Sequence, residues 1–178
     1  INTINGAEIT NQFFVPSDGT DIAYGGDGDD TLNGAGGNDQ LFGGSPNENS
    51  AQDGDDTLIG GDGDDNINGG TGDDNINGGN DDDNLNGGLG NDILNAGDGT
   101  DILDGGDGDD TYQLSKGVNV ITSTFTQGDD LITNEAGFTD VQVIGYDDDK
   151  NAPLLPLIYQ EEWAEVYVAN NIYTDANG

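Results

Sequence analysis

The chain has 178 residues with 37 acidic side chains, only two lysines or arginines and no histidine, so its formal net charge is -35 at pH 7. It therefore lacks the basic groups with which proteins bind nucleic acid or anionic membranes. Because cysteine and histidine are both absent, it offers no disulfide, no thiolate or imidazole ligand for a metal and no imidazole base for catalysis.

The hydrophobic fraction is only 31%, and high charge with low hydrophobicity favours disorder. The chain is therefore either an unfolded acidic tail or a fold that cations complete. No apolar stretch approaches the roughly 20 residues of a membrane span. The chain begins with Ile1, Asn2 and Thr3 instead of a methionine, which indicates a piece of a longer protein or a processed product.

Residues 1–24 form the first predicted segment, an N-terminal cap followed by one faint copy of the repeat described next. Within residues 1–15, the apolar side chains that we expect to cover one end of the fold are Ile1, Ile4, Ile9, Phe13, Phe14 and Val15. The faint copy, Pro16–Tyr24, keeps Gly19 and Asp21 in register and has Ala23 in the apolar column.

Residues 25–113 form the second segment, which repeats every nine residues. Two units read GGDGDDNIN at 60–68 and GGTGDDNIN at 69–77, and nine units start at residues 25, 34, 43, 60, 69, 78, 87, 96 and 105. The unit that starts at 43 carries eight extra residues, Ser45 to Gln52, which predict a polar surface loop. We expect this insert to weaken the metal site of its own unit.

Two columns of the repeat keep the same residue type in all nine units. Position eight is always large and apolar, namely Leu32, Leu41, Leu58, Ile67, Ile76, Leu85, Leu94, Leu103 and Tyr112. Position six is always aspartate, namely Asp30, Asp39, Asp56, Asp65, Asp74, Asp83, Asp92, Asp101 and Asp110. The first six positions predict a glycine-rich turn and the last three a short strand with one inward side chain. One inward residue per unit buries too little alone, so the units must stack.

This nonapeptide resembles the repeat of RTX (repeats-in-toxin, haemolysin-type) proteins, a pattern typical of calcium-binding parallel β-helices. The resemblance covers residues 25–113, about half of the chain. It implies an all-β fold, a parallel β-roll or β-solenoid with a C-terminal β-hairpin cap. Two units form each turn of such a coil, so that unit n stacks on unit n+2 and position-eight side chains form two facing columns.

The resemblance also implies a calcium ion between each stacked pair of turns, which gives about seven or eight ions. The implied carboxylate pairs are Asp30 with Asp56, Asp39 with Asp65, Asp56 with Asp74, Asp65 with Asp83, Asp74 with Asp92, Asp83 with Asp101 and Asp92 with Asp110, and Asp21 with Asp39 as an eighth. The glycines at positions two and four whose carbonyls would complete the shells are Gly26, Gly28, Gly44, Gly54, Gly61, Gly63, Gly70, Gly72, Gly79, Gly88, Gly90, Gly97, Gly99, Gly106 and Gly108.

The chemistry of these ligands favours calcium over other cations. Calcium is a hard ion that takes six to eight oxygens, whereas magnesium demands tight octahedral geometry and softer metals prefer histidine or cysteine. The bland alternative is that the Asp-Gly columns are only solvated acidic turns. That alternative explains the composition but does not explain the fixed phase of position six. The position-five acids, such as Asp73, are expected to face solvent and not to bind metal.

The outer asparagines of the strands leave two interpretations open. They are Asn66, Asn68, Asn75, Asn77, Asn84, Asn86 and Asn95. A flat sugar- or ice-binding surface is the functional interpretation, and hydrogen-bonded polar side chains on stacked strands are the simpler one.

Residues 114–178 form the third segment, two faint repeat copies followed by a C-terminal cap. Leu114–Thr122 has Asn119 in place of the aspartate, and Phe125–Thr133 keeps Asp130. The stretches 154–159 and 163–168 predict the two strands of a hairpin that hides the open end of a solenoid.

The sequence as a whole predicts a calcium-binding module, not an enzyme. Twenty-two aspartates and one glutamate lie within residues 25–113 without a positive charge, so the segment is expected to stay disordered until calcium binds. The resemblance implies an extracellular, secreted or cell-surface location and export through type I secretion machinery, with no membrane insertion and no nucleic-acid partner. The alternatives are an accessory module of a secreted enzyme and an adhesin segment that binds sugar or ice.

Overall fold

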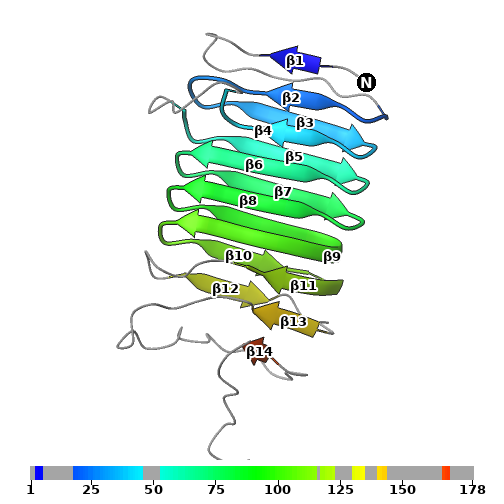
Figure 1. Ribbon diagram of the computed structural model, residues 1–178, viewed down its shortest axis with the longest axis vertical. Coiled ribbons are helices and arrows are strands. Elements are labelled where there is room, and N and C mark those ends of the chain that lie inside the picture. Colours follow the sequence, from blue (N-terminus) through cyan, green and yellow to red (C-terminus); the bar gives the residue numbers. More distant parts are fainter. Residues whose placement is uncertain are drawn as a thin grey trace, which may run out of the picture.

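The repeats wind into a parallel β-solenoid with two units in each turn, as the sequence predicts (Figure 1). The computed structural model describes residues 3–5, 18–45, 53–115, 117–122, 130–134, 140–143 and 166–168. The strands lie in two opposed layers, and the arrows of β3, β5 and β7 point opposite to those of β4, β6 and β8 (Figure 1). Glycine-rich turns join the layers along two edges.

One layer holds the strands in the order β1, β2, β4, β6, β8, β9, β11, β13 and β14, and every pairing is parallel. Their bounds are β1 (Thr3–Asn5), β2 (Ile22–Tyr24), β4 (Gln40–Phe42), β6 (Asn66–Thr71), β8 (Asn84–Leu89), β9 (Ile93–Asp107), β11 (Gly117–Ile121), β13 (Asp140–Val143) and β14 (Val166–Val168). The second layer contains β3 (Thr31–Gly36), β5 (Thr57–Asp62), β7 (Asn75–Asn80), β10 (Thr111–Leu114) and β12 (Leu131–Asn134). The long strand β9 belongs to both layers, since its first part pairs with β7 and its second part with β8.

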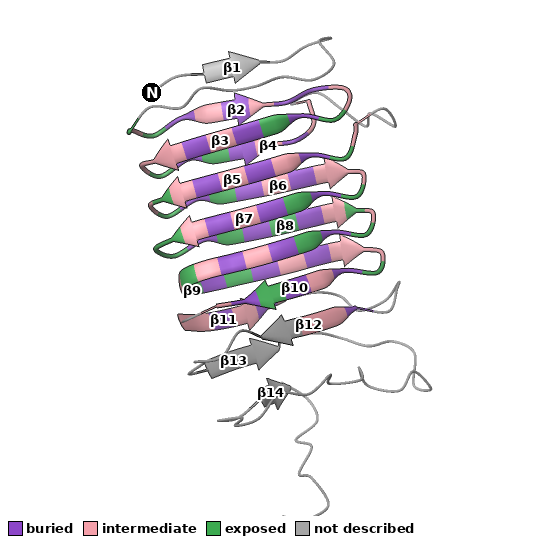
Figure 2. Ribbon diagram, turned by 180° about the vertical axis from the view of Figure 1, so that it is seen from behind, coloured by how far each residue is buried: buried purple, intermediate pink, exposed green. Residues whose placement is uncertain are grey.

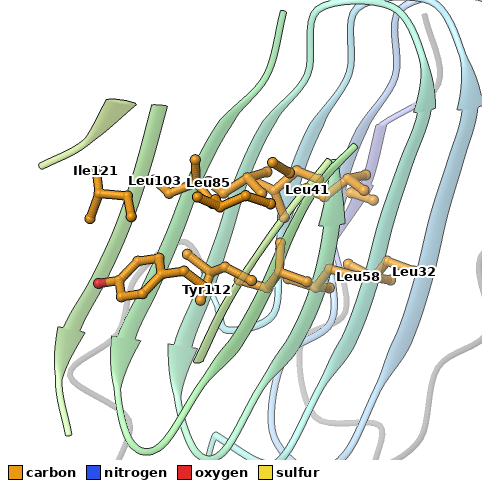
Figure 3. Packing of buried hydrophobic residues seen from close by; sticks show 13 residues of the cluster. Leu32, Leu41, Leu58, Leu85, Leu103, Tyr112 and Ile121 are labelled. Carbon is orange, nitrogen blue, oxygen red and sulfur yellow. The ribbon is translucent and has the colours of Figure 1, made fainter. Parts of the chain in front are cut away.

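The hydrophobic core consists of the two predicted columns of position-eight side chains. Leu32 is in register with Leu58 and Leu58 with Ile76, while Leu41 is in register with Ile67 on the opposite layer. Figure 3 shows the two rows facing each other across the coil. The faint repeats extend these rows, because Ala23 and Ile121 are also buried, and Ile132 packs against the cluster.

The strands are longer than the three residues predicted from the repeat. A strand such as β5 covers positions seven to nine and continues through positions one to three of the next unit. Burial alternates along it, so position one also points inward (Figure 2). The prediction of a single inward residue was wrong. Position one is glycine, so its inward direction leaves no apolar side chain that the sequence could reveal. Glycine is required there because a Cβ on Gly60 would collide with the carboxylate of Asp65.

Left-handed backbone conformations explain the glycines at positions two and four in every unit except the one that carries the insert. Gly79 at position two has φ 125°, and a Cβ there would collide with the carbonyl oxygen of Gly61 in the turn below. Two residues other than glycine adopt this conformation, Ala35 at position two with φ 70° and Asp81 at position four with φ 75°. These two turns are therefore strained relative to their neighbours.

The ends of the coil are described only in part. Strand β1 pairs with β2 at the N-terminal end, and β14 pairs with β13 at the C-terminal end. The predicted hairpin lies outside the described residues except for 166–168, and so does the predicted insert loop except for Ser45. Among the residues described, no helix is long and apolar enough to cross a membrane.

Replacing Ala35 by glycine is expected to stabilise the folded chain by about 0.5–1 kcal/mol, since the left-handed penalty of about 1–2 kcal/mol exceeds the cost of a more flexible unfolded chain. The matched variant Gly79→Ala should destabilise it, because both the conformation and the space at position 79 require glycine. Urea unfolding at saturating calcium measures both values. A loss of stability in Ala35→Gly would contradict the assignment of strain to Ala35.

Candidate metal centre

The ten aspartates predicted as ligands lie in the turns at the two edges of the coil, and each is at most 3% exposed. The first edge contains the turns 25–30, 43–45 with 53–56, 69–74, 87–92 and 105–110, and the second contains the turn that ends at Asp21 and the turns 34–39, 60–65, 78–83 and 96–101. Successive units alternate between the edges because each strand crosses the coil. Buried carboxylates on this scale require compensation by hydrogen bonds or cations.

The backbone compensates one of the two oxygens of these carboxylates. From Asp39 to Asp110, the Oδ1 atom of each position-six aspartate accepts a hydrogen bond from the backbone N–H of the position-six aspartate two units earlier, at 2.7–3.1 Å. The bonded pairs are Asp21 with Asp39, Asp30 with Asp56, Asp39 with Asp65, Asp56 with Asp74, Asp65 with Asp83, Asp74 with Asp92, Asp83 with Asp101 and Asp92 with Asp110. Every pair of aspartates that the resemblance implied is thus adjacent in the structure.

The second carboxylate oxygen is left without such a bond. Within the described residues, the buried Oδ2 atoms that accept no hydrogen bond belong to Asp39, Asp56, Asp65, Asp74, Asp83, Asp92, Asp101 and Asp110. A buried and unsatisfied oxygen costs about 1–3 kcal/mol, and more when it carries charge. These atoms therefore need a partner when they are ionised.

Burial is the main cause of strongly raised pKa values along both edges. It raises the pKa of Asp74 and Asp83 to about 8, that of Asp56, Asp65 and Asp92 to about 7, and that of Asp101 to about 6. The accepted backbone hydrogen bond lowers each pKa in part, and the carboxylates of adjacent turns raise it further. Burial raises the pKa of Asp39 and Asp110 in the same direction.

No basic side chain of the described residues neutralises these acids. The chain contains only two lysines, Lys116 and Lys150, and both lie outside the described ranges. Nor does the described part of the chain bring three or more acidic side chains together in a group that could hold a metal by itself. A cation in these turns would therefore need backbone oxygens as well as carboxylates.

Backbone oxygens line the same space. The Oδ2 of Asp65 occupies the space that a Cβ on Gly60 would take, and the carbonyl oxygen of Gly78 approaches the same space. The same arrangement of a position-six carboxylate and a position-one carbonyl recurs at Gly69 and Gly87. Sequence reasoning named carbonyls at positions two and four but not at position one. The pattern that could have indicated position one is its glycine, which occurs in eight of the nine units. These glycines do not have a left-handed φ, so they are required only because a side chain would not fit.

The glycines named from the sequence stack directly above one another. The carbonyl of Gly61 points at Gly79, and that of Gly72 points at Gly90, so each column presents oxygens along the edge. Carboxylate and carbonyl oxygens are the ligands that calcium prefers, in numbers of six to eight and at flexible geometry. The donor set, with buried Oδ2 atoms among backbone carbonyls, fits this ion.

Both edges continue beyond the nine units. Asp130 is 6% exposed, and its Oδ1 accepts a hydrogen bond from the N–H of Asp110 at 3.0 Å. Asp130 was in register in the sequence but was not named as a ligand, because a two-residue slip precedes it. On the second edge, Asn119 is in register with Asp101 and fully buried, and neither atom of its amide has a hydrogen-bond partner within the described residues.

The position-five residues form a separate, exposed ladder, as predicted. Asp55, Asp73 and Asn91 are exposed, and each Oδ1 accepts a hydrogen bond from the backbone N–H of the position-five residue two units later. This polarity is opposite to that of position six, where the acceptor belongs to the later unit. Solvent therefore compensates position five, whereas position six faces the interior.

The geometry is that of a parallel β-solenoid whose stacked turns gather carboxylate and carbonyl oxygens. The model of the RTX calcium-binding nonapeptide repeat, with four copies, matches residues 16–45, 50–85 and 77–112, which together make up more than half of the chain. The chain belongs to this family, and the predicted resemblance is confirmed. Comparison with curated proteins and with solved structures gave no match.

The raised pKa values predict that acid favours the metal-free coil. The folded aspartates bind protons up to pH 6–8, whereas an unfolded aspartate releases its proton near the ordinary value of 3.8. The folded state therefore gains protons relative to the unfolded state, and its stability should rise as the pH falls from about 8 toward 4. Circular dichroism in excess chelator, recorded between pH 8 and pH 5, should show growing β structure. A signal that stays disordered throughout would contradict the raised values.

Proposed function

We propose that this chain is a calcium-binding RTX module that folds when calcium binds outside the cell, as part of a larger bacterial protein exported by type I secretion. The observation that carries the proposal is the double row of buried position-six carboxylates, which no basic side chain of the described residues neutralises. RTX repeats bind calcium and occur in secreted bacterial proteins, which supports both the ion and the extracellular location.

The coupling between binding and folding follows from the electrostatics. The turns bring like charges to adjacent levels of the coil, and the unfolded chain avoids this repulsion by expanding. A cation between two levels would accept the orphaned Oδ2 atoms and the turn carbonyls, so that metal binding and folding become one event. Extracellular calcium suffices for sites with dissociation constants on the order of 10⁻⁴–10⁻³ M.

The number and ligands of the ions are part of the same proposal. One ion for each of the stacked pairs between Asp21 and Asp110 gives seven or eight, and the pair of Asp110 with Asp130 offers one more position. The turn carbonyls of positions one, two and four would complete each shell. We assign the chain no catalytic role. Any catalytic domain of the parent protein would lie outside this chain.

The outer asparagines give less support to a sugar- or ice-binding adhesin. Asn84 is in register with Asn66, but the next residue of that row is Ile102. Asn75 is likewise followed by Ile93, and Asn86 by Asp104. A regular flat array over many turns is therefore interrupted, which favours the simpler interpretation of polar residues on exposed strands.

Calcium titration of the purified chain tests the proposal. Far-ultraviolet circular dichroism should change steeply from a disordered to a β spectrum with calcium, and magnesium at equal concentration should leave it largely disordered. A β spectrum in excess chelator at pH 8 would overturn the coupling of folding to calcium.

Two adjacent aspartates provide a matched pair of variants. Asp74→Asn removes a buried charge and keeps an acceptor for the N–H of Asp56, so the calcium midpoint should rise on the order of tenfold. Asp73→Asn removes an exposed, solvent-screened charge and should shift the midpoint by less than about twofold. Equal shifts in the two variants would exclude position six as the ligand column.

A further inference from the structure

The turn that carries the insert contains an acidic side chain in an unusual place. Asp53 is at position three of its unit, and the insert separates it from Gly44 at position two. In an ordinary unit, position three directly follows position two and its side chain faces solvent, as at Asp62. Because the insert separates Asp53 from Gly44, the covalent link to position two does not fix the backbone of Asp53, and other contacts determine its position.

Those contacts hold Asp53 between two levels of the first edge. Its backbone forms an isolated parallel bridge with Gly28 in the turn on one side. Its Oδ2 accepts a hydrogen bond from the backbone N–H of Thr71, in the turn on the other side, at 3.0 Å. One neighbouring turn therefore holds the backbone of Asp53, and the other holds its carboxylate.

A carboxylate oxygen here takes the place that a backbone carbonyl occupies in the other units. At Gly79, Gly88 and Gly106, the atom against the position-two glycine is the carbonyl oxygen of the position-two glycine two units earlier. At Gly70 the corresponding atom is the Oδ2 of Asp53, and the carbonyl of Gly44 is not among the nearest atoms. This turn thus exchanges a neutral oxygen for a charged one.

The remaining oxygen of Asp53 points to a ligand. Its Oδ1 is buried and has no hydrogen-bond partner within the described residues. In the same turn, Asp56 is 1% exposed, and its Oδ2 also lacks a hydrogen bond and faces Gly43. Burial raises the pKa of Asp53, and the carboxylates of Asp27 and Asp30 add to this, which indicates that several negative groups are close.

We propose that Asp53 is an additional calcium ligand, and that it makes the insert-bearing turn the site of highest calcium affinity in the coil. The inference rests on the proposed function and extends it to one residue that the repeat does not predict. It reverses the expectation from the sequence, in which the insert weakens the site of its own unit. The physical reason is charge, because calcium affinity rises with the number of carboxylate ligands.

Asp53→Asn in the full chain tests the proposal, with Asp62→Asn as the matched control. Both variants remove one charge from position three and keep an acceptor, for the N–H of Thr71 in the first case and the side chain of Asn80 in the second. Isothermal titration with calcium and competition with a chromophoric chelator resolve the tight and weak sites. Circular dichroism at saturating calcium checks that each variant is folded.

The expected result is that Asp53→Asn weakens the tightest site on the order of tenfold and leaves the weaker sites unchanged. Asp62→Asn should leave the tightest site as it is in the unaltered chain. Identical titrations for the two variants, or a tight site that survives Asp53→Asn, would overturn the role of Asp53 alone. An unaltered chain that binds no calcium would overturn the proposed function, and this inference with it.

Discussion

The stacking of buried carboxylates at identical heights of successive turns is the constraint on which the rest of the structure depends. Each position-six aspartate gives one oxygen to a backbone N–H of the neighbouring turn, and this bond fixes the register of the whole coil. The same bond places the second oxygen in the interior, where water does not reach it. The bond that fixes the register therefore leaves one buried oxygen of the carboxylate without a partner, and no basic side chain of the described residues neutralises it. A cation, or a proton at lower pH, must do so.

The thin core makes this dependence strong. Each unit contributes one large apolar side chain, such as Leu58 or Ile67, and burial of such a side chain stabilises by about 1.5–3 kcal/mol. The second inward position is glycine, which adds almost no apolar area because the carboxylate occupies its space. The repeat thus gives up half of its inward positions to the carboxylates, and its hydrophobic packing has little apolar area with which to offset their burial.

Much of this architecture is readable from the sequence because strict periodicity records it. The fixed phases of positions six and eight identified the aspartate and apolar columns, and the resemblance to RTX repeats, which implies two units per turn, predicted the two facing core columns and every stacked pair from Asp21 to Asp110. The features that were missed depend on backbone geometry. The inward direction of position one is invisible when the residue has no side chain, as at Gly60. The displacement of Asp53 depends on an insert that interrupts the period, and the role of Asp130 is hidden by the slip before it.

The alternation of turns between two edges also restricts how such a chain can change in length. Loss of one nine-residue unit would move every later turn to the opposite edge, where its aspartate would meet an equivalent column, but it would also move the strands after the repeats to the other side of the coil. Loss of two units would keep all later turns in place, since strands pair at a spacing of 18 residues in regular parts of the coil. The 26-residue spacing of Asp30 and Asp56 shows a third route, in which a unit carries eight extra residues and its aspartate still stacks on the same edge. Length variation that keeps the later strands on their own side of the coil is therefore expected in pairs of repeats or within single turns.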